Sequence, residues 1–247
     1  MGSVIAVASG KGGTGKTTTL NALIYILSLR NYSISLAAPT GRAAKRITEL
    51  TGREAMTIHR LLEVEWGSDD NLKFSRNERN PLTCQVLIVD EISMVDAIVF
   101  EKLLKALKLS CRIILVGDAD QLPSIGAGNI LSDILNSDIF PSIKLNKVFR
   151  QANESLIVTN AHSIINNEKI DFARKDSDFF LLKRNDNFSV IDTVLQLCCD
   201  RIPTAYGFDP LKDIQVLCPS RKLDTGTVNF NNLLQERLNP RKKKQPL

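Results

Sequence analysis

The chain has 247 residues, 43% hydrophobic and 24% charged, a balance that excludes disordered, collagenous and fibrous proteins. No apolar run approaches the ~20 residues of a membrane helix and no secretory signal is recognisable, so we expect no membrane partner. The five cysteines include no CxxC pair, which predicts free thiols in a reducing, cytoplasmic protein. The net charge of +5 gives no indication of a binding partner, because four consecutive basic residues at 241–244 supply most of it.

Short β-branched runs alternate with helical segments in the first part of the chain. This pattern predicts an α/β fold, with a parallel sheet covered by helices on both faces. Helices are expected where apolar residues recur at intervals of three and four, from residue 16, after residue 39 and after residue 91. The expected strands are Val4–Ser9, 33–38, 85–89, 112–116 and 143–145.

The alternation of strand-like and helical segments is interrupted at two places along the chain. The stretch 63–80 predicts an inserted hairpin or excursion, and after about residue 150 a new unit is expected. We therefore divide the chain into a first domain at 1–152 and an incomplete second unit at 153–247. That second unit is expected to contain strands at 179–182 and 214–217 and a helix at 228–238. We also expect the chain to be a fragment of a longer protein.

A glycine-rich turn joins the first strand to the first helix and fits G-x-x-x-x-G-K-[ST]. Its backbone N–H groups can converge on an anion, and the helix start adds a positive dipole end. Lys16 would reach the β- and γ-phosphates of a nucleotide, and the Thr17 hydroxyl would ligate Mg²⁺. The expected nucleotide-binding residues are Gly10, Lys11, Gly12, Gly13, Thr14, Gly15, Lys16, Thr17 and Thr18.

Polar side chains follow three later strands. Asp90 is expected to hold Mg²⁺, and Glu91 to polarise an attacking water. Gln121 either senses the γ-phosphate or belongs to an ordinary polar turn. Arg150 either stabilises the charge of a transition state or forms a surface salt bridge.

Five segments together resemble, in order and spacing, the motor motifs of RecD-like superfamily-one DNA helicases (exodeoxyribonuclease V alpha-subunit-like). The segments are GKGGTGKTTT, APTGRAAKRITELTG with TIHRLL, VLIVDEISMVD, VGDADQLPSIGAGNIL and LNKVFRQA. The resemblance implies a three-layer RecA-like P-loop lobe at 1–152, followed by the partial start of a second such lobe. It also implies ATP and Mg²⁺ as cofactors, 5′-to-3′ movement on single-stranded DNA, and a helicase–nuclease or relaxase assembly. The catalytic residues would be Lys16, Glu91, Gln121 and Arg150.

The same resemblance implies that Pro39, Thr40 and Arg42 lie along the DNA strand. Residues 40–60 carry five cations against two anions, and a helix start at Thr40 suits a backbone phosphate. The alternative is a solvated basic helix face. His59 matches the family signature, with a structural histidine as the alternative. Trp66 and Phe74 either stack on bases or anchor the excursion.

Lys11 departs from the RecD-like pattern and resembles the signature lysine of ParA/MinD-type dimerising ATPases. Against that alternative, the second expected strand ends in Ala-Ala-Pro-Thr-Gly rather than in the acidic switch of those enzymes. A non-catalytic DNA-binding module is a third possibility. The resemblance also implies an adenine-recognition segment before the first strand and further motor motifs in the second lobe, and we expect neither among these 247 residues. We therefore expect these residues alone to bind nucleotide weakly, hydrolyse it poorly and leave duplex DNA intact.

Overall fold

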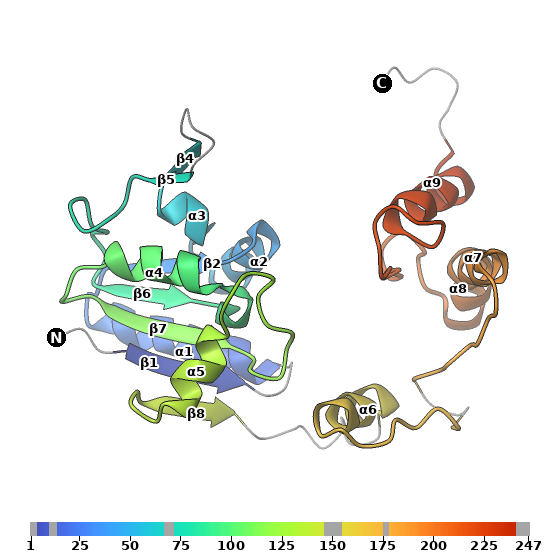
Figure 1. Cartoon of the computed structure of the whole chain (residues 1–247), viewed down its shortest axis with the longest axis horizontal. Helices are drawn as coiled ribbons and strands as arrows, with labels where there is room; N and C mark the ends of the chain where they lie inside the picture. Colours follow the sequence, from blue (N-terminus) through green and yellow to red (C-terminus); the bar gives the residue numbers. More distant parts are fainter. Residues whose placement is uncertain (1–3, 10–13, 67–71, 146–154, 175–177, 241–247) are drawn as a thin grey trace. The chain divides into compact units, whose positions relative to one another are not determined.

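The computed structural model describes residues 4–9, 14–66, 72–145, 155–174 and 178–240 (Figure 1). The chain divides into two compact units, Met1–Ile170 and Asp171–Leu247. The expected boundary at residue 152 lies outside the described residues, and the division at 1–152 and 153–247 stays a prediction. No helix in these ranges combines the length and apolar character needed to cross a bilayer.

The first unit is built on a sheet of six parallel strands, in the order β3-β2-β6-β7-β1-β8. All five predicted strands of this sheet are confirmed. The sixth, β3, has only three residues, too few for a periodic pattern to reveal it. The strands are β1 (Val4–Ser9), β2 (Ile34–Ala38), β3 (Ala55–Thr57), β6 (Val86–Val89), β7 (Arg112–Gly117) and β8 (Ser142–Leu145).

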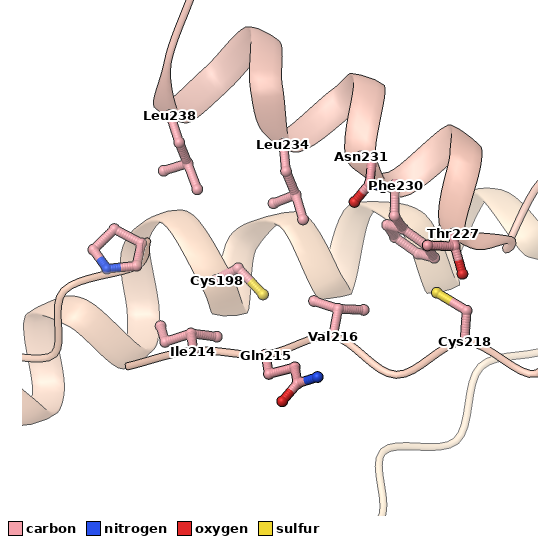
Figure 2. A pocket seen from close by; sticks show the side chains of 11 residues that line it. Cys198, Ile214, Gln215, Val216, Cys218, Thr227, Phe230, Asn231, Leu234 and Leu238 are labelled. Carbon is pink, nitrogen blue, oxygen red and sulfur yellow. The ribbon is translucent and has the colours of Figure 1, made fainter. Parts of the chain in front are cut away.

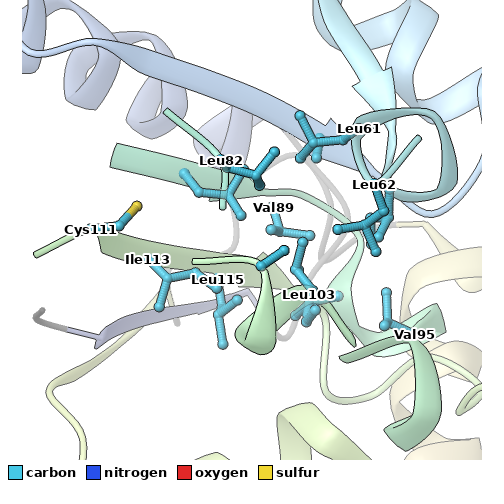
Figure 3. Close-up of a cluster of buried hydrophobic side chains, with 14 of the residues drawn as sticks. Leu61, Leu62, Leu82, Val89, Val95, Leu103, Cys111, Ile113 and Leu115 are labelled. Atoms are coloured by element: carbon cyan, nitrogen blue, oxygen red, sulfur yellow. The ribbon is translucent and has the colours of Figure 1, made fainter. Parts of the chain in front are cut away.

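Helices cover both faces of this sheet because its central strands are apolar on both sides. On one face, Leu87 and Val89 of β6 pack with Leu103 of α4 (Figure 3). On the other, Val86 and Ile88 pack in a cluster with α1 and α2. The predicted α/β P-loop fold is therefore confirmed. The helical segments of the first unit, of which α6 does not cover the sheet, are α1 (Thr14–Leu29), α2 (Gly41–Thr51), α3 (Ile58–Leu61), η1 (Ile92–Met94), α4 (Ala97–Lys105), α5 (Ile130–Asn136) and α6 (Leu156–Ile165).

The predicted insertion is a two-stranded antiparallel hairpin, β4 (Val64–Trp66) and β5 (Leu72–Phe74). Its base is closed where the N–H of Ser75 donates to the carbonyl of Glu63 at 3.3 Å. Arg76 also pairs with Glu63, at 2.8 Å. Val64 and Phe74 pack against the buried cluster of Figure 3, which favours anchoring for Phe74. The side chain of Trp66 lies outside the described part.

The second unit is helical in its described residues. α7 (Asn187–Gln196), the π-helical turn η3 (Leu197–Arg201) and α8 (Ile202–Tyr206) follow one another, and α9 (Thr227–Leu238) confirms the predicted last helix. The strands predicted at 179–182 and 214–217 are wrong. An apolar run becomes a strand only where a neighbour exchanges backbone hydrogen bonds with it, and no described segment pairs with either.

Residues 214–216 instead line a pocket of about 300 Å³ together with Cys198 and one side of α9 (Figure 2). Phe230 and Leu234 of α9 point into this pocket, and Phe230 is almost fully buried. The apolar character of 214–216 therefore serves packing against helices.

Candidate active site

The carboxyl ends of the central strands bring the predicted nucleotide motifs to one edge of the sheet. β7 lies between β1 and β6, with Gly117 opposite Ala8 of β1 and Leu115 opposite Val89 of β6. The end of β1, the acidic pair after β6 and the Gln121 loop after β7 therefore share this edge. Ligands of open α/β sheets bind at such carboxyl ends.

The described part of the phosphate loop is its helical end. Thr14, Gly15, Lys16 and Thr17 form the first turn of α1, and the side chain of Thr18 is exposed. The predicted nucleotide ligands Gly10, Lys11, Gly12 and Gly13 lie outside the described residues, as do Arg150 and the side chains of Lys16 and Thr17. Their assigned roles stay predictions.

Asp90 and Glu91 are held in place by the backbone. The N–H of Asp90 donates to the carbonyl of Ala37 at 2.9 Å, which extends the β2–β6 pairing by one residue. Oδ1 of Asp90 accepts the N–H of Glu91 at 2.9 Å. Glu91 has a left-handed backbone with φ of +54°, which is uncommon for a glutamate and which a functional site can retain. Its Oε2 is shielded from solvent.

Gln121 is oriented by a neighbouring carboxylate. Asp118 is only 6% exposed, and its Oδ1 accepts the N–H of Asp120 at 3.1 Å. Its Oδ2 accepts the side-chain Nε2 of the exposed Gln121 at 3.4 Å. Sequence reasoning missed this positioning role of Asp118. The signal available was an aspartate in a tight turn directly after a buried strand.

The loop that carries Gln121 rests on the beginning of α4. The N–H of Ala97 donates to the carbonyl of Ala127 at 2.9 Å, and the carboxylate of Asp96 lies against Gly126. Ser124 braces the loop internally by donating its hydroxyl to the Gly126 carbonyl at 3.0 Å. The segments after β6 and after β7 therefore meet at one interface. Asp96 was also missed, although an aspartate before an apolar helix is a common N-cap signal.

The predicted DNA-contacting residues gather at the same edge, beyond β6. Ala38 of β2 pairs with Thr57 of β3, so the helices that follow these strands begin next to each other. Thr40 caps α2 by accepting the N–H of Ala43 at 3.2 Å. Thr57 caps α3 by accepting the N–H of Arg60 at 3.1 Å.

The N-terminus of α2 supplies the positive end of a helix dipole at this place, while α3 is a single turn. Arg42 and His59 are exposed beside them, and Pro39 is half-buried. The structure therefore brings together all four residues predicted to contact DNA, while the contact itself stays a prediction.

The chain is similar in sequence to known proteins. Residues 1–127, more than half of the chain, match the family model described as AAA domain. Over 239 residues the chain is 34% identical to the ATP-dependent RecD2 DNA helicase of Deinococcus radiodurans, which covers 97% of this chain and 31% of that protein. It is 37% identical over 155 residues to the RecBCD enzyme subunit RecD of Mycobacterium tuberculosis, which covers 53% of this chain and 26% of that protein.

A solved structure has the same fold. The Pif1 helicase from Candida albicans matches 81% of this chain and 51% of its own length with a TM-score of 0.51 and 22% sequence identity. The chain thus spans about a third or less of the two curated relatives and about half of the solved one.

Proposed function

The chain belongs to the AAA domain family and is RecD-like, of the superfamily-one helicases, and on this premise we propose that it forms the nucleotide-binding part of an ATP-driven DNA helicase. Membership of this family confirms the resemblance found in the motifs. The observation that supports the proposal is the strand order β6-β7-β1, which brings the acidic pair, the Gln121 loop and the end of β1 to one edge. The direction of movement, 5′ to 3′ on single-stranded DNA, is part of the proposal.

The carboxylate of Asp90 fits a magnesium ion. It stands half-buried at the tip of β6, and carboxylate oxygens are the ligands that Mg²⁺ prefers. With Thr17 it would hold the ion, which neutralises phosphate charge when bound. Lys16 and the N–H groups of the loop would bind the β- and γ-phosphates of ATP.

Hydrolysis would depend on groups at the same edge. Glu91, with its left-handed backbone, would orient the attacking water and accept its proton. Gln121, held by Asp118, would respond to the γ-phosphate. Arg150 would stabilise the charge that develops in the transition state.

DNA would pass over the two capped helix starts. Pro39, Thr40, Arg42 and His59 lie there, and contacts to phosphates can follow a strand without reading its bases. The N–H of Asp90 is hydrogen-bonded to the carbonyl of Ala37 in β2, the strand that precedes these residues. A movement of Asp90 on nucleotide binding would therefore be passed through the backbone to the proposed DNA-binding residues.

Strand separation would need more than these residues. Motor helicases act through two lobes that close on ATP, and the described part of the second unit contains no strand. We therefore expect weak hydrolysis and no unwinding from the 247 residues alone. One relative is named as a subunit of the RecBCD enzyme, so a larger helicase–nuclease assembly is proposed for the parent protein, with a relaxase as the other candidate.

ATP hydrolysis with and without single-stranded DNA tests the proposal, on this chain and on the longer parent protein. We expect DNA to stimulate the parent, and Lys16→Ala or Glu91→Gln to abolish its turnover. Lys222→Ala and Glu236→Gln, at exposed positions of the second unit, are matched controls that should retain it. Near-normal turnover in Lys16→Ala or Glu91→Gln would contradict the assignment.

The two alternatives give different outcomes in the same experiment. ATP-dependent dimerisation that requires Lys11 and ignores DNA would support the ParA/MinD-type ATPase. DNA binding with no hydrolysis in the parent protein would support a non-catalytic module.

A further inference from the structure

The first helix of the sheet is apolar on its outer side as well as on its inner side. α1 contains one charged residue, Lys16, and none from residue 17 to residue 29. Its inner side packs on the sheet through Leu20 and Ile24, which are both buried. A surface helix normally carries charged residues on its outer face, and a helix that is apolar all round is normally buried. The outer face of α1 therefore has the composition of a buried surface.

The exposed apolar side chains of α1 form one continuous stripe. Ala22, Tyr25, Ile26 and Leu29 recur at intervals of three and four, so they lie on the same side of the helix. Tyr25 and Leu29 are each 66% exposed, and Ile26 is 52% exposed. A stripe with this spacing is the surface against which another helix packs.

The end of α2 lies beside this stripe and adds to it. The side-chain amide of Asn21 donates to the carbonyl of Leu50 at 3.3 Å, and the guanidinium of Arg53 donates to the hydroxyl of Ser28 at 2.9 Å. Both helices lie on the face of the sheet away from α4 (Figure 1). Leu50 is 44% exposed. The α1 patch is defined as the side chains of Ala22, Tyr25, Ile26, Leu29 and Leu50.

The border of the α1 patch is mainly basic. Its exposed cations are Arg30, Lys45, Arg46 and Arg53, and its exposed anions are Glu49 and Glu54. Because Glu49 is paired with Lys45 at 3.8 Å, the other three cations stand against Glu54 alone. An exposed apolar patch with a polar border marks an interaction site, and charges across an interface are complementary. The matching surface is therefore apolar and bordered by acidic side chains.

The size and charge of the patch decide between possible occupants. Specific complexes between separate proteins bury about 20–30 residues on each side, many more than the patch contains. Two copies of this chain related by a two-fold axis would bring their basic borders together, which like charges oppose. A segment of the same polypeptide needs less contact area, because tethering gives it an effective concentration of about 1 mM. The RecD2 helicase of Deinococcus radiodurans is matched over 31% of its length, so most of that relative lies outside the matched part.

We propose that the α1 patch is the docking site for a helical segment of the parent protein that lies outside these 247 residues. The apolar face of that segment would cover Tyr25, Ile26 and Leu29, and acidic side chains at its border would meet Arg30 and Arg53. The proposal rests on the proposed function, because it requires the longer helicase. A segment docked there would hold the helix whose first turn contains Lys16.

Photo-crosslinking of the parent protein identifies the occupant. Tyr25 is replaced by p-benzoyl-phenylalanine, the protein is irradiated, and joined peptides are identified by mass spectrometry. We expect an intramolecular link to a peptide outside these 247 residues that has apolar residues at intervals of three and four and flanking aspartate or glutamate. A link to a second copy, a link only to these 247 residues, a linked peptide without acidic residues, or no link would each overturn the proposal.

Two glutamine variants of the parent protein measure what the docked segment contributes. Leu29→Gln is expected to lower the midpoint of thermal unfolding by about 4 °C, because it removes an apolar contact. Leu104→Gln, at an exposed leucine of α4, is the matched control and should change the midpoint by less than about 1 °C. Equal shifts in the two variants would overturn the proposal.

ATP hydrolysis with and without single-stranded DNA, measured on the same unmodified parent protein, separates this proposal from the proposed function. DNA stimulation without the expected crosslink would overturn the docking site alone. The expected crosslink without DNA stimulation would support the docking site and contradict the proposed function.

Discussion

The carboxylate of Asp96 fills the place that a side chain at Gly126 would occupy. A β-carbon added at Gly126 would lie 2.6 Å from Oδ2 of Asp96 and 2.7 Å from its β-carbon. Asp96 cannot easily move away, because its Oδ1 accepts the N–H of Val99 at 2.8 Å and so caps α4. The contact between Asp96 and Gly126 therefore packs the loop that carries Gln121 against the segment that follows Glu91.

Replacing Gly126 by alanine is expected to destabilise the first unit by about 1–3 kcal/mol, the usual cost of forcing extra volume into a packed contact. Urea unfolding measures this cost. Gly41→Ala is the matched control, since no atom lies within 4 Å of a β-carbon added there. Equal stability of the two variants would mean that the loop moves away from Asp96 without cost.

Thr40→Ala is expected to lower the free energy of unfolding by about 1 kcal/mol, because it removes the side-chain cap of α2. Thr40→Ser retains the hydroxyl and should stay near the original stability. Urea unfolding of both variants separates the cap from the methyl group. A larger loss in Thr40→Ser than in Thr40→Ala would contradict the capping role.

Ser93→Ala is expected to leave stability unchanged or to raise it by about 1 kcal/mol. The Ser93 side chain is 5% exposed, and its hydroxyl has no hydrogen-bond partner among the described residues. A buried polar group without a partner costs free energy, so its removal is tolerated. Thermal unfolding measures the change, and a clear loss would reveal a partner for this hydroxyl.

The stability of the second unit is expected to fall in acid through Asp186. The N–H and hydroxyl of Ser189 donate to this carboxylate and lower its pKa in the folded state. A lowered folded pKa means that the contribution is present above the unfolded pKa, near 3.9, and is lost as the pH falls through the folded value. Circular dichroism melts between pH 7 and pH 2.5 measure this dependence.

Asp186→Asn provides the control for that dependence, since asparagine still caps α7 but does not titrate in this range. Its melts should change less with pH than those of the original chain. Identical acid profiles would assign the loss to other carboxylates.

Elements with a strong local pattern were predictable from the sequence. The buried run that ends at Val89 fixed both the strand and the place of Asp90, because the carboxyl ends of parallel strands share an edge. By contrast, Asp96 and Gly126 are far apart in the sequence, and no periodic pattern predicts their contact. The strand predicted at 214–217 failed for a related reason: its apolar residues pack on helices, and pairing depends on a partner that the pattern does not contain.

The closed base of the β4–β5 hairpin also makes it a replaceable module. Glu63 and Ser75, where the chain leaves and returns, are bonded to each other, and the Val64–Phe74 pair anchors the stem to the core. The residues beyond that pair can therefore be shortened, lengthened or exchanged for a tag or a fluorophore site without shifting the sheet. The hairpin tip is thus a natural attachment point on this lobe for labels and affinity handles.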